Sequence, residues 1–201
     1  MGAFKIFSAE FKASCGAVEQ FPKSRLPEIA MVGRSNVGKS SAINCLLNRQ
    51  GLAKVGKIPG KTQTINFYKV ETNQGEFGLV DLPGYGFAKV PEHVRKHWIP
   101  LIEQYFQVRS NLRGVVLLVD VRRAQEQDRD MLGWLEHLGI PYVVVATKAD
   151  KVVRGKRAAA IQDLCRSLNL PTDPILLSAQ TGEGKQSVLD RIQKFFPPKT
   201  R

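Results

Sequence analysis

The sequence has little cysteine and histidine, and it lacks a long apolar run. Its three cysteines and three histidines are scattered over 201 residues, without zinc-site spacing or the even cysteine number typical of a disulfide framework. We therefore expect Cys15, Cys45 and Cys165 to be reduced. No apolar stretch reaches the roughly 20 residues that span a bilayer. The first residues lack a signal-peptide core, and Ile6 stands where myristoylation needs Ser or Thr. These absences favour a cytoplasmic protein without a membrane partner.

Acidic residues are scarce relative to basic ones. Thirty Lys and Arg stand against eighteen Asp and Glu, which gives a formal net charge of +12 and a pI near 9.8. Such a balance favours a polyanionic partner, and we expect RNA rather than DNA. No RNA-binding module motif is present, so contact with the RNA backbone and shape is favoured over base reading.

Residues 33–40 read Gly-Arg-Ser-Asn-Val-Gly-Lys-Ser, the complete GxxxxGK[ST] pattern of a phosphate-binding loop. An apolar run at 29–32 precedes it and a helical pattern follows, as this loop requires. Gly33 and Gly38 allow backbone N–H groups to approach a polyphosphate, while Lys39 reaches the outer phosphates. The Ser40 hydroxyl is a Mg²⁺ ligand in this pattern. A chance glycine-rich turn is the weaker alternative. The predicted phosphate-binding residues are Gly33, Arg34, Ser35, Asn36, Val37, Gly38, Lys39, Ser40 and Ser41.

Two later loops favour guanine as the base. Each follows a strand-like apolar run, where α/β sheets place ligands. A carboxylate such as Asp150 can accept hydrogen bonds from both the N1–H and the amine of guanine, a donor pair that adenine lacks. Alone, the Asp150 loop is more typical of an ordinary exposed turn; together with the phosphate loop it indicates GTP. The base-binding loops comprise Thr147, Lys148, Ala149 and Asp150, and Ser178, Ala179 and Gln180.

Two loops between these motifs have the composition of γ-phosphate sensors. In the first, Asp81, Leu82, Pro83 and Gly84 follow a strand-like run; Asp81 would hold Mg²⁺, and the Gly84 N–H would meet the γ-phosphate. In the second, Thr62 would add a second hydroxyl to Mg²⁺ when GTP is bound, although Thr64 is a rival. The predicted catalytic residues are Lys39, Thr62 and Gly84, the predicted metal ligands are Ser40, Thr62 and Asp81, and the second loop comprises Pro59, Gly60, Lys61 and Thr62.

These motifs in this order resemble the TrmE–Era–EngA–EngB translation-factor class of GTPases. Within that class the chain is similar to the EngB (YihA/YsxC) family of ribosome-assembly GTPases, on the stretches Asp-Leu-Pro-Gly-Tyr-Gly-Phe-Ala at 81–88 and Pro-Gly-Lys-Thr-Gln-Thr-Ile-Asn-Phe-Tyr at 59–68. The resemblance runs from about residue 25 to the end. It implies a monomeric Ras-like GTPase that uses GTP, GDP and Mg²⁺. It further implies action on a large-subunit assembly intermediate, and support of cell division through ribosome supply.

Three positions depart from the general GTPase pattern or leave alternatives open. Thr147 stands where Asn is usual and its hydroxyl is shorter than an amide, so we expect less help from it in selecting guanine. Tyr85 stands where many GTPases have a water-orienting Gln, which leaves the catalytic group unnamed and predicts slow hydrolysis, raised by a partner or by potassium. Asn36 either holds K⁺ beside the phosphates or serves only a left-handed loop.

Basic residues gather in three groups. The first two flank the sensing loops, which favours RNA contact over a merely solvated face; for the third the two readings are even. The groups are Lys54, Lys57, Lys61 and Lys69; Lys89, Arg95 and Lys96; and Arg154, Lys156, Arg157 and Arg166.

Three alternative functions remain at this point: a GTPase acting on another RNA, a nucleotide-gated module with negligible hydrolysis, and an ATP-using P-loop enzyme, which Asp150 disfavours.

The pattern of apolar residues predicts an α/β domain of three layers, and the resemblance implies that it is a Ras-like P-loop GTPase domain. We expect a six-stranded, mostly parallel sheet with one antiparallel edge strand and helices on both faces. Residues 25–201 would form a single GTP-binding domain, and residues 1–24 an N-terminal extension that is either an additional strand or an arm. The expected strands are 28–32, 65–71, 75–81, 113–120, 141–147 and 174–178, and the expected helices are 39–49, 91–107, 126–138, 155–168 and 184–196.

Overall fold

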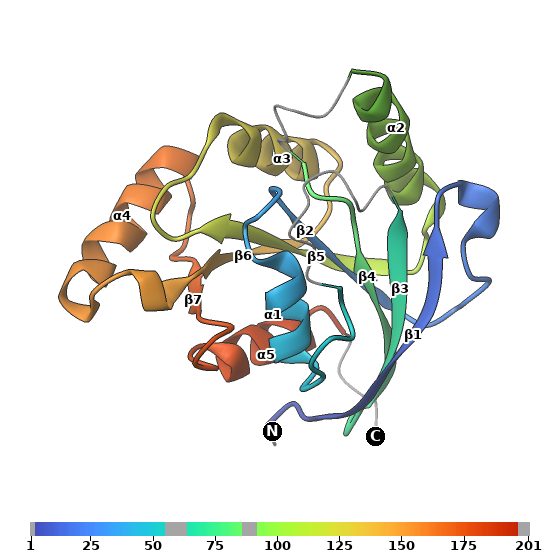
Figure 1. Ribbon diagram of the computed structural model, residues 1–201, viewed down its shortest axis with the longest axis horizontal. Coiled ribbons are helices and arrows are strands. Elements are labelled where there is room, and N and C mark those ends of the chain that lie inside the picture. The colour runs from blue at the N-terminus through green and yellow to red at the C-terminus, as the bar shows by residue number, and fades with distance from the viewer. Residues whose placement is uncertain (1–2, 55–63, 86–91, 197–201) are drawn as a thin grey trace.

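Seven strands form one twisted sheet with helices on both faces (Figure 1). The computed structural model describes residues 3–54, 64–85 and 92–196, with the backbone alone for 92–99. The strand order is β1-β3-β4-β2-β5-β6-β7. The strands are β1 (Ile6–Cys15), β2 (Glu28–Gly33), β3 (Ile65–Thr72), β4 (Gly75–Asp81), β5 (Leu112–Asp120), β6 (Tyr142–Thr147) and β7 (Ile175–Leu177). The helices are α1 (Lys39–Leu46), α2 (Glu92–Val108), α3 (Glu126–His137), α4 (Arg157–Leu168) and α5 (Lys185–Gln193).

The predicted fold class is confirmed, with a difference at one edge of the sheet. Strands β4, β2, β5, β6 and β7 are parallel, and β3 is antiparallel to β4 as expected. However, the sheet has seven strands rather than six, because β1 pairs antiparallel with β3 and takes the edge position. The open question about the first residues therefore has an answer: residues 6–15 are a strand of the same sheet.

Strand β1 carries two register shifts, between Ile6 and Ser8 and between Phe11 and Ala13. Each shift turns the following side chains to the other face of the sheet. Ala9 consequently lies in the core beneath α1 and α5, whereas Cys15 lies in the core on the opposite face. The bulges also disturb the edge against pairing with another chain. They hide the period-2 alternation by which a strand is recognised in a sequence.

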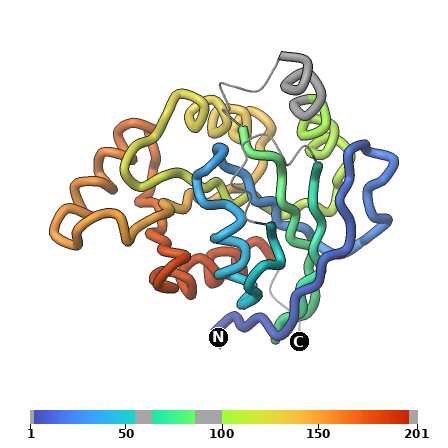
Figure 2. The backbone as a smooth tube through the Cα atoms, in the orientation of Figure 1, coloured from blue at the N-terminus to red at the C-terminus, as the bar shows by residue number. Residues whose placement is uncertain are grey.

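Two apolar cores hold the layers together. One lies between the sheet and helices α2, α3 and α4, and the other between the sheet and helices α1 and α5. Strand β2 is buried along its whole length because both faces are covered. At the far end of the second core, Phe4 and Phe77 both pack against Phe196, so the first and last described segments meet (Figure 2).

A buried polar cluster fastens α2 to the amino end of β2. The Tyr105 hydroxyl donates to Glu28 Oε2 at 3.1 Å, and the Arg109 guanidinium donates to both Glu28 carboxylate oxygens. Arg109 also lies 5.5 Å from the centre of the Phe67 ring. Because Glu28 is 2% exposed, its charge needs these partners. The cluster lies at the opposite end of β2 from the phosphate-binding loop.

Among the residues that the structure describes, none of the helices combines the length and apolar character needed to cross a membrane.

Candidate nucleotide-binding site

Four loops that the sequence singled out follow the carboxyl ends of strands in one sheet. Residues 34–38 follow β2, residues 82–84 follow β4, residues 148–150 follow β6, and residues 178–180 follow β7. Since these four strands are parallel, their loops lie along one edge (Figure 1). Ligands of open α/β sheets bind at this edge.

The loop of residues 34–38 has the backbone of an anion nest. Asn36 and Gly38 have φ values of 63° and 98°, and α1 begins at Lys39. Such alternation points successive N–H groups toward a concavity, and the start of α1 adds its partial positive charge. Gly33 has no room for a side chain, because a Cβ there would lie 2.9 Å from the Leu118 carbonyl oxygen. The loop therefore fits a polyphosphate.

The predicted Mg²⁺ and phosphate residues come together on two of these loops. Lys39 Nζ forms an ion pair with the Asp81 carboxylate, and the two side chains are only 10% and 5% exposed. Ser40 and Ser41 lie next to Lys39 in the first turn of α1. Hydroxyl and carboxylate oxygens are ligands that suit Mg²⁺, so the chemistry of Ser40 and Asp81 fits the metal. Leu82 and Pro83 are buried, and Gly84 is half-buried.

The rest of the predicted metal set falls on residues 55–63. Thr62, together with Pro59, Gly60 and Lys61, lies outside the described residues. The rival Thr64 is described, and its hydroxyl oxygen accepts a hydrogen bond from Ser14 Oγ of β1 at 2.7 Å. The assignment of Thr62 stays a prediction.

At the base side, Asp150 is oriented by the neighbouring loop. Ser178 Oγ donates to Asp150 Oδ1 at 2.8 Å. This hydrogen bond is the main reason that the pKa of Asp150 is lowered, which keeps the carboxylate charged and acceptor-only. Ala149 and Ser178 are buried, Ala179 is half-buried and Gln180 is exposed. The two base loops that the sequence placed together are thus joined directly.

Thr147 is tied to the phosphate loop more closely than the sequence suggested. Its hydroxyl lies 2.7 Å from the Val37 carbonyl oxygen and 3.1 Å from that of Val119. A hydroxyl has one hydrogen to donate, so it serves one of these acceptors at a time. The shorter side chain therefore reaches the phosphate loop directly, while the expectation that Thr147 helps less in selecting guanine stays a prediction.

Lys148 contacts two other loops of the site, and the sequence indicated neither contact. The residue has φ 60°, and Nζ donates to the Asn36 carbonyl oxygen at 2.7 Å. It also lies 3.0 Å from Asp120 Oδ2, at the end of β5. Burial alone would raise the pKa of Asp120, but hydrogen bonds from Arg122 and Lys148 outweigh it and hold the pKa well below its usual range. No motif marks Asp120, since only the sheet brings it beside Lys148.

Arg157 was grouped with surface cations, but it is a clamp between the base loops. Its guanidinium donates to the carbonyl oxygens of Ala149 at 3.0 Å and Val152 at 3.1 Å, and it pairs with Glu183. Glu183 lies just beyond Gln180. The clamp therefore fixes the spacing of the two loops that would hold guanine.

The other residues of the three basic groups differ, because some are exposed and others form ion pairs with a carboxylate. In the first group, Lys54 is exposed, whereas Lys69 pairs with Glu76 at 2.7 Å. In the third group, Arg154 and Lys156 are exposed, and Arg166 pairs with Asp163. Lys57, Lys61 and Lys89 lie outside the described residues, as do the side chains of Arg95 and Lys96.

Comparison with known proteins decides the family. The sequence model of the family described as "50S ribosome-binding GTPase" matches residues 28–148. The chain is 48% identical over 195 residues to "Probable GTP-binding protein EngB" of Heliobacterium modesticaldum, covering 96% of this chain and 94% of that protein. It is 46% identical to the same-named protein of Pelotomaculum thermopropionicum, covering 95% and 96%. The chain belongs to the EngB family of GTP-binding proteins.

A solved structure agrees with this assignment. The crystal structure of a probable GTP-binding protein EngB superposes with a TM-score of 0.67 at 26% identity, covering 84% of this chain and 97% of that one. The family resemblance expected from the motifs is therefore confirmed. The region matched by the family model includes the phosphate loop, the Asp81 loop and Thr147, while Asp150 and Ser178 lie beyond it. For an EngB-family chain, binding of GTP or GDP, typically with Mg²⁺, follows from membership.

Proposed function

We propose that this EngB-family protein hydrolyses GTP slowly and is a γ-phosphate-gated switch in assembly of the large ribosomal subunit in the bacterial cytoplasm. The observation that carries the proposal is the convergence, on one sheet edge, of a phosphate nest, the Lys39–Asp81 pair and the Ser178-oriented Asp150. The phosphates, the metal ion and the guanine base would then each be bound by different residues along this edge. Growth and cell division would depend on the protein through ribosome supply.

The residue roles follow the loops. Residues 33–41 would bind the phosphates, with Lys39 on the outer ones; Ser40 and Asp81, joined by Thr62, would hold Mg²⁺. Gly84 would contact the γ-phosphate through its N–H. Residues 147–150 and 178–180 would bind guanine. Mg²⁺ supplies charge neutralisation at the phosphates when bound.

The partner is proposed from charge and from the family description. A net charge of +12 suits the phosphate backbone of ribosomal RNA, and the matched family is described as ribosome-binding. A GTPase acting on another RNA, or a binding module with negligible turnover, are the competing functions. The ATP-using alternative is disfavoured because Asp150 presents an acceptor pair for guanine donors.

Co-sedimentation with ribosomal particles tests the switch. We expect the monomeric protein loaded with a non-hydrolysable GTP analogue to sediment with large subunits, and the GDP-loaded protein to sediment much less. Raising the salt from 50 to 200 mM should weaken association, because phosphate contacts release counterions; the loss for about six such contacts is roughly 10³-fold. Lys39→Ala, unable to hold nucleotide, is the control. Equal or absent association in both nucleotide states would remove the ribosome from the function.

Potassium is proposed as an activator through the Asn36 amide oxygen. The φ of 63° at Asn36 agrees with the conformational alternative, so the two roles must be separated by substitution. We expect wild-type turnover to be roughly tenfold or more faster in K⁺ than in Na⁺, because a cation beside the phosphates stabilises developing charge. Asn36→Gly tolerates the left-handed backbone but lacks the amide, so it should bind GTP and lose the potassium effect. Equal wild-type rates in the two salts would refute this role.

A further inference from the structure

The phosphate loop and the γ-phosphate-sensing loop are bonded to each other through backbone groups. The Ser35 N–H donates to the Tyr85 carbonyl oxygen at 2.9 Å, and Ser35 Oγ donates to the Gly84 carbonyl oxygen at 3.2 Å. Arg34 and Tyr85 form a parallel β-bridge. The approach is close: a Cβ on Gly84 would lie 3.0 Å from Ser35 Oγ. The position of Gly84 therefore depends on what holds Tyr85.

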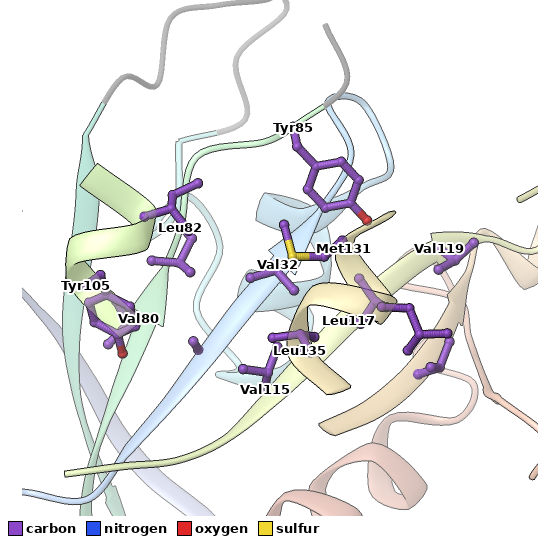
Figure 3. Close-up of a cluster of buried hydrophobic side chains, with 14 of the residues drawn as sticks. Val32, Val80, Leu82, Tyr85, Tyr105, Val115, Leu117, Val119, Met131 and Leu135 are labelled. Carbon is purple, nitrogen blue, oxygen red and sulfur yellow. The ribbon is translucent and has the colours of Figure 1, made fainter. Parts of the chain in front are cut away.

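The Tyr85 side chain is held from the other direction by α3. Its hydroxyl donates to Asp128 Oδ1 at 2.9 Å. Tyr85 is 5% exposed and belongs to the same core cluster as the buried side chains of Val32 and Met131 (Figure 3). Burial, followed by the neighbouring Asp128 charge, raises the pKa of Tyr85, so the phenol keeps its proton and can donate. A phenol fixed in this way is not free to orient an attacking water.

Asp128 gathers groups from the phosphate loop, the sensing loop and its own helix. The carboxylate is fully buried. Its Oδ2 accepts the Gln125 N–H at 2.9 Å, and Arg34 Nε lies 3.7 Å from the same oxygen. That nitrogen is buried and has no hydrogen-bond partner among the described residues. The hydrogen bond from the Tyr85 hydroxyl is therefore the short side-chain contact between Asp128 and the sensing loop.

We propose that Tyr85 is a positioning residue for γ-phosphate recognition, and that its hydroxyl bond to Asp128 holds the Gly84 backbone in place before the triphosphate arrives. This inference rests on the proposed role of the Gly84 N–H at the γ-phosphate. Without the Tyr85–Asp128 hydrogen bond, the Gly84 backbone would become ordered only when GTP binds. The entropy cost of that ordering would then reduce the free energy of GTP binding. GDP has no γ-phosphate for Gly84 to meet, so its affinity is unaffected. Discrimination between the two nucleotides is thus the property that Tyr85 sets.

The chain offers a matched control for the test. Tyr105, like Tyr85, is a buried tyrosine whose hydroxyl donates to a buried carboxylate, that of Glu28. It lies at the amino end of β2, away from the phosphate loop. Tyr85→Phe and Tyr105→Phe each remove one oxygen and keep the ring. Both should lower the melting temperature by similar amounts, whereas only Tyr85→Phe should alter discrimination.

The experiment measures dissociation constants for GDP and for a non-hydrolysable GTP analogue by displacement of a fluorescent GDP. For Tyr85→Phe we expect analogue affinity to fall about tenfold, the low end for a hydrogen bond to a charged group, with GDP affinity within about twofold of wild type. Tyr105→Phe should leave both constants unchanged. Asp128→Ala, which removes the acceptor of the Tyr85 hydroxyl, should reproduce the loss of discrimination and serves as the second variant.

Two results would overturn the inference. One is unchanged discrimination in both folded Tyr85→Phe and folded Asp128→Ala. The other is an equal loss in Tyr105→Phe, which would make the effect one of stability alone. Failure of the proposed γ-phosphate contact of Gly84 gives a different result, since the wild-type protein would then bind GDP and the analogue with equal affinity. A wild type that discriminates beside variants that discriminate equally well would refute only the role of Tyr85.

Discussion

Replacing Asp150 with Asn is expected to lower the affinity for GTP and GDP by roughly a hundred- to a thousandfold, because a donor then faces the amine of guanine. The carboxylate accepts from Ser178 Oγ at 2.8 Å, so its orientation is set before a base arrives. An Asn side chain in the same orientation would present one acceptor and one donor. Xanthine keeps the N1–H donor and carries an oxygen at C2, so it can pair with both the oxygen and the NH₂ of the Asn amide. Affinity for xanthosine diphosphate should therefore rise while affinity for GDP falls.

Calorimetric titration with the two diphosphates checks this result. Asp163→Asn is the matched control, since Asp163 is an exposed aspartate on α4 that pairs with Arg166. It should leave both affinities unchanged. Asp150→Asn protein that still prefers GDP over xanthosine diphosphate would show that another residue reads the base.

Replacing Lys39 with Ala is expected to have two separable effects. Loss of charge-assisted hydrogen bonds to the outer phosphates should lower GTP affinity by roughly a hundred- to a thousandfold. The free protein should also be less stable, because the Asp81 carboxylate, 5% exposed, is left without its cation. Leaving a buried charge unpaired costs about 3 kcal/mol or more. Nucleotide titration and thermal melting measure the two effects.

A second substitution separates the two effects. Asp81→Asn in the Lys39→Ala background removes the unpaired charge, so the melting temperature should recover while GTP binding does not. Lys69→Ala is the control, since Lys69 is half-buried and pairs with Glu76 but lies on β3, away from the phosphate loop. Near-normal GTP affinity in Lys39→Ala would contradict the assignment of this lysine to the phosphates.

The elements that could be predicted are those with a local signal. Strand β2, the phosphate loop and α1 follow from an apolar run, two glycines with special backbone needs and a helical period. The structure has each of them: β2 runs one residue beyond the expected 28–32, and α1 ends three residues before the expected end at 49. Strand β1 could not be predicted with the same certainty. Its ten residues contain two bulges, and each bulge inverts the alternation on which recognition depends.

The residues missed at the site share one property: each acts through a contact that no sequence motif indicates and that only the folded chain makes. Asp128 occupies the first turn of α3, where an acidic residue needs no explanation beyond helix capping. Only packing of α3 against the sheet brings it to the Tyr85 hydroxyl. Arg157 likewise reads as a surface cation until folding places its guanidinium on the Ala149 carbonyl oxygen.

The sequence by itself determined the nucleotide chemistry of this protein and its family. A phosphate nest, a Mg²⁺ acid and a guanine-reading carboxylate each require particular residues at short spacing, and short spacing is visible in a sequence. The tertiary structure alone decided how these loops are held: Thr147 on the phosphate loop, Lys148 on Asp120, and Tyr85 on Asp128. The physical reason is that a buried polar group needs a partner, and which partner it finds depends on how strands and helices pack.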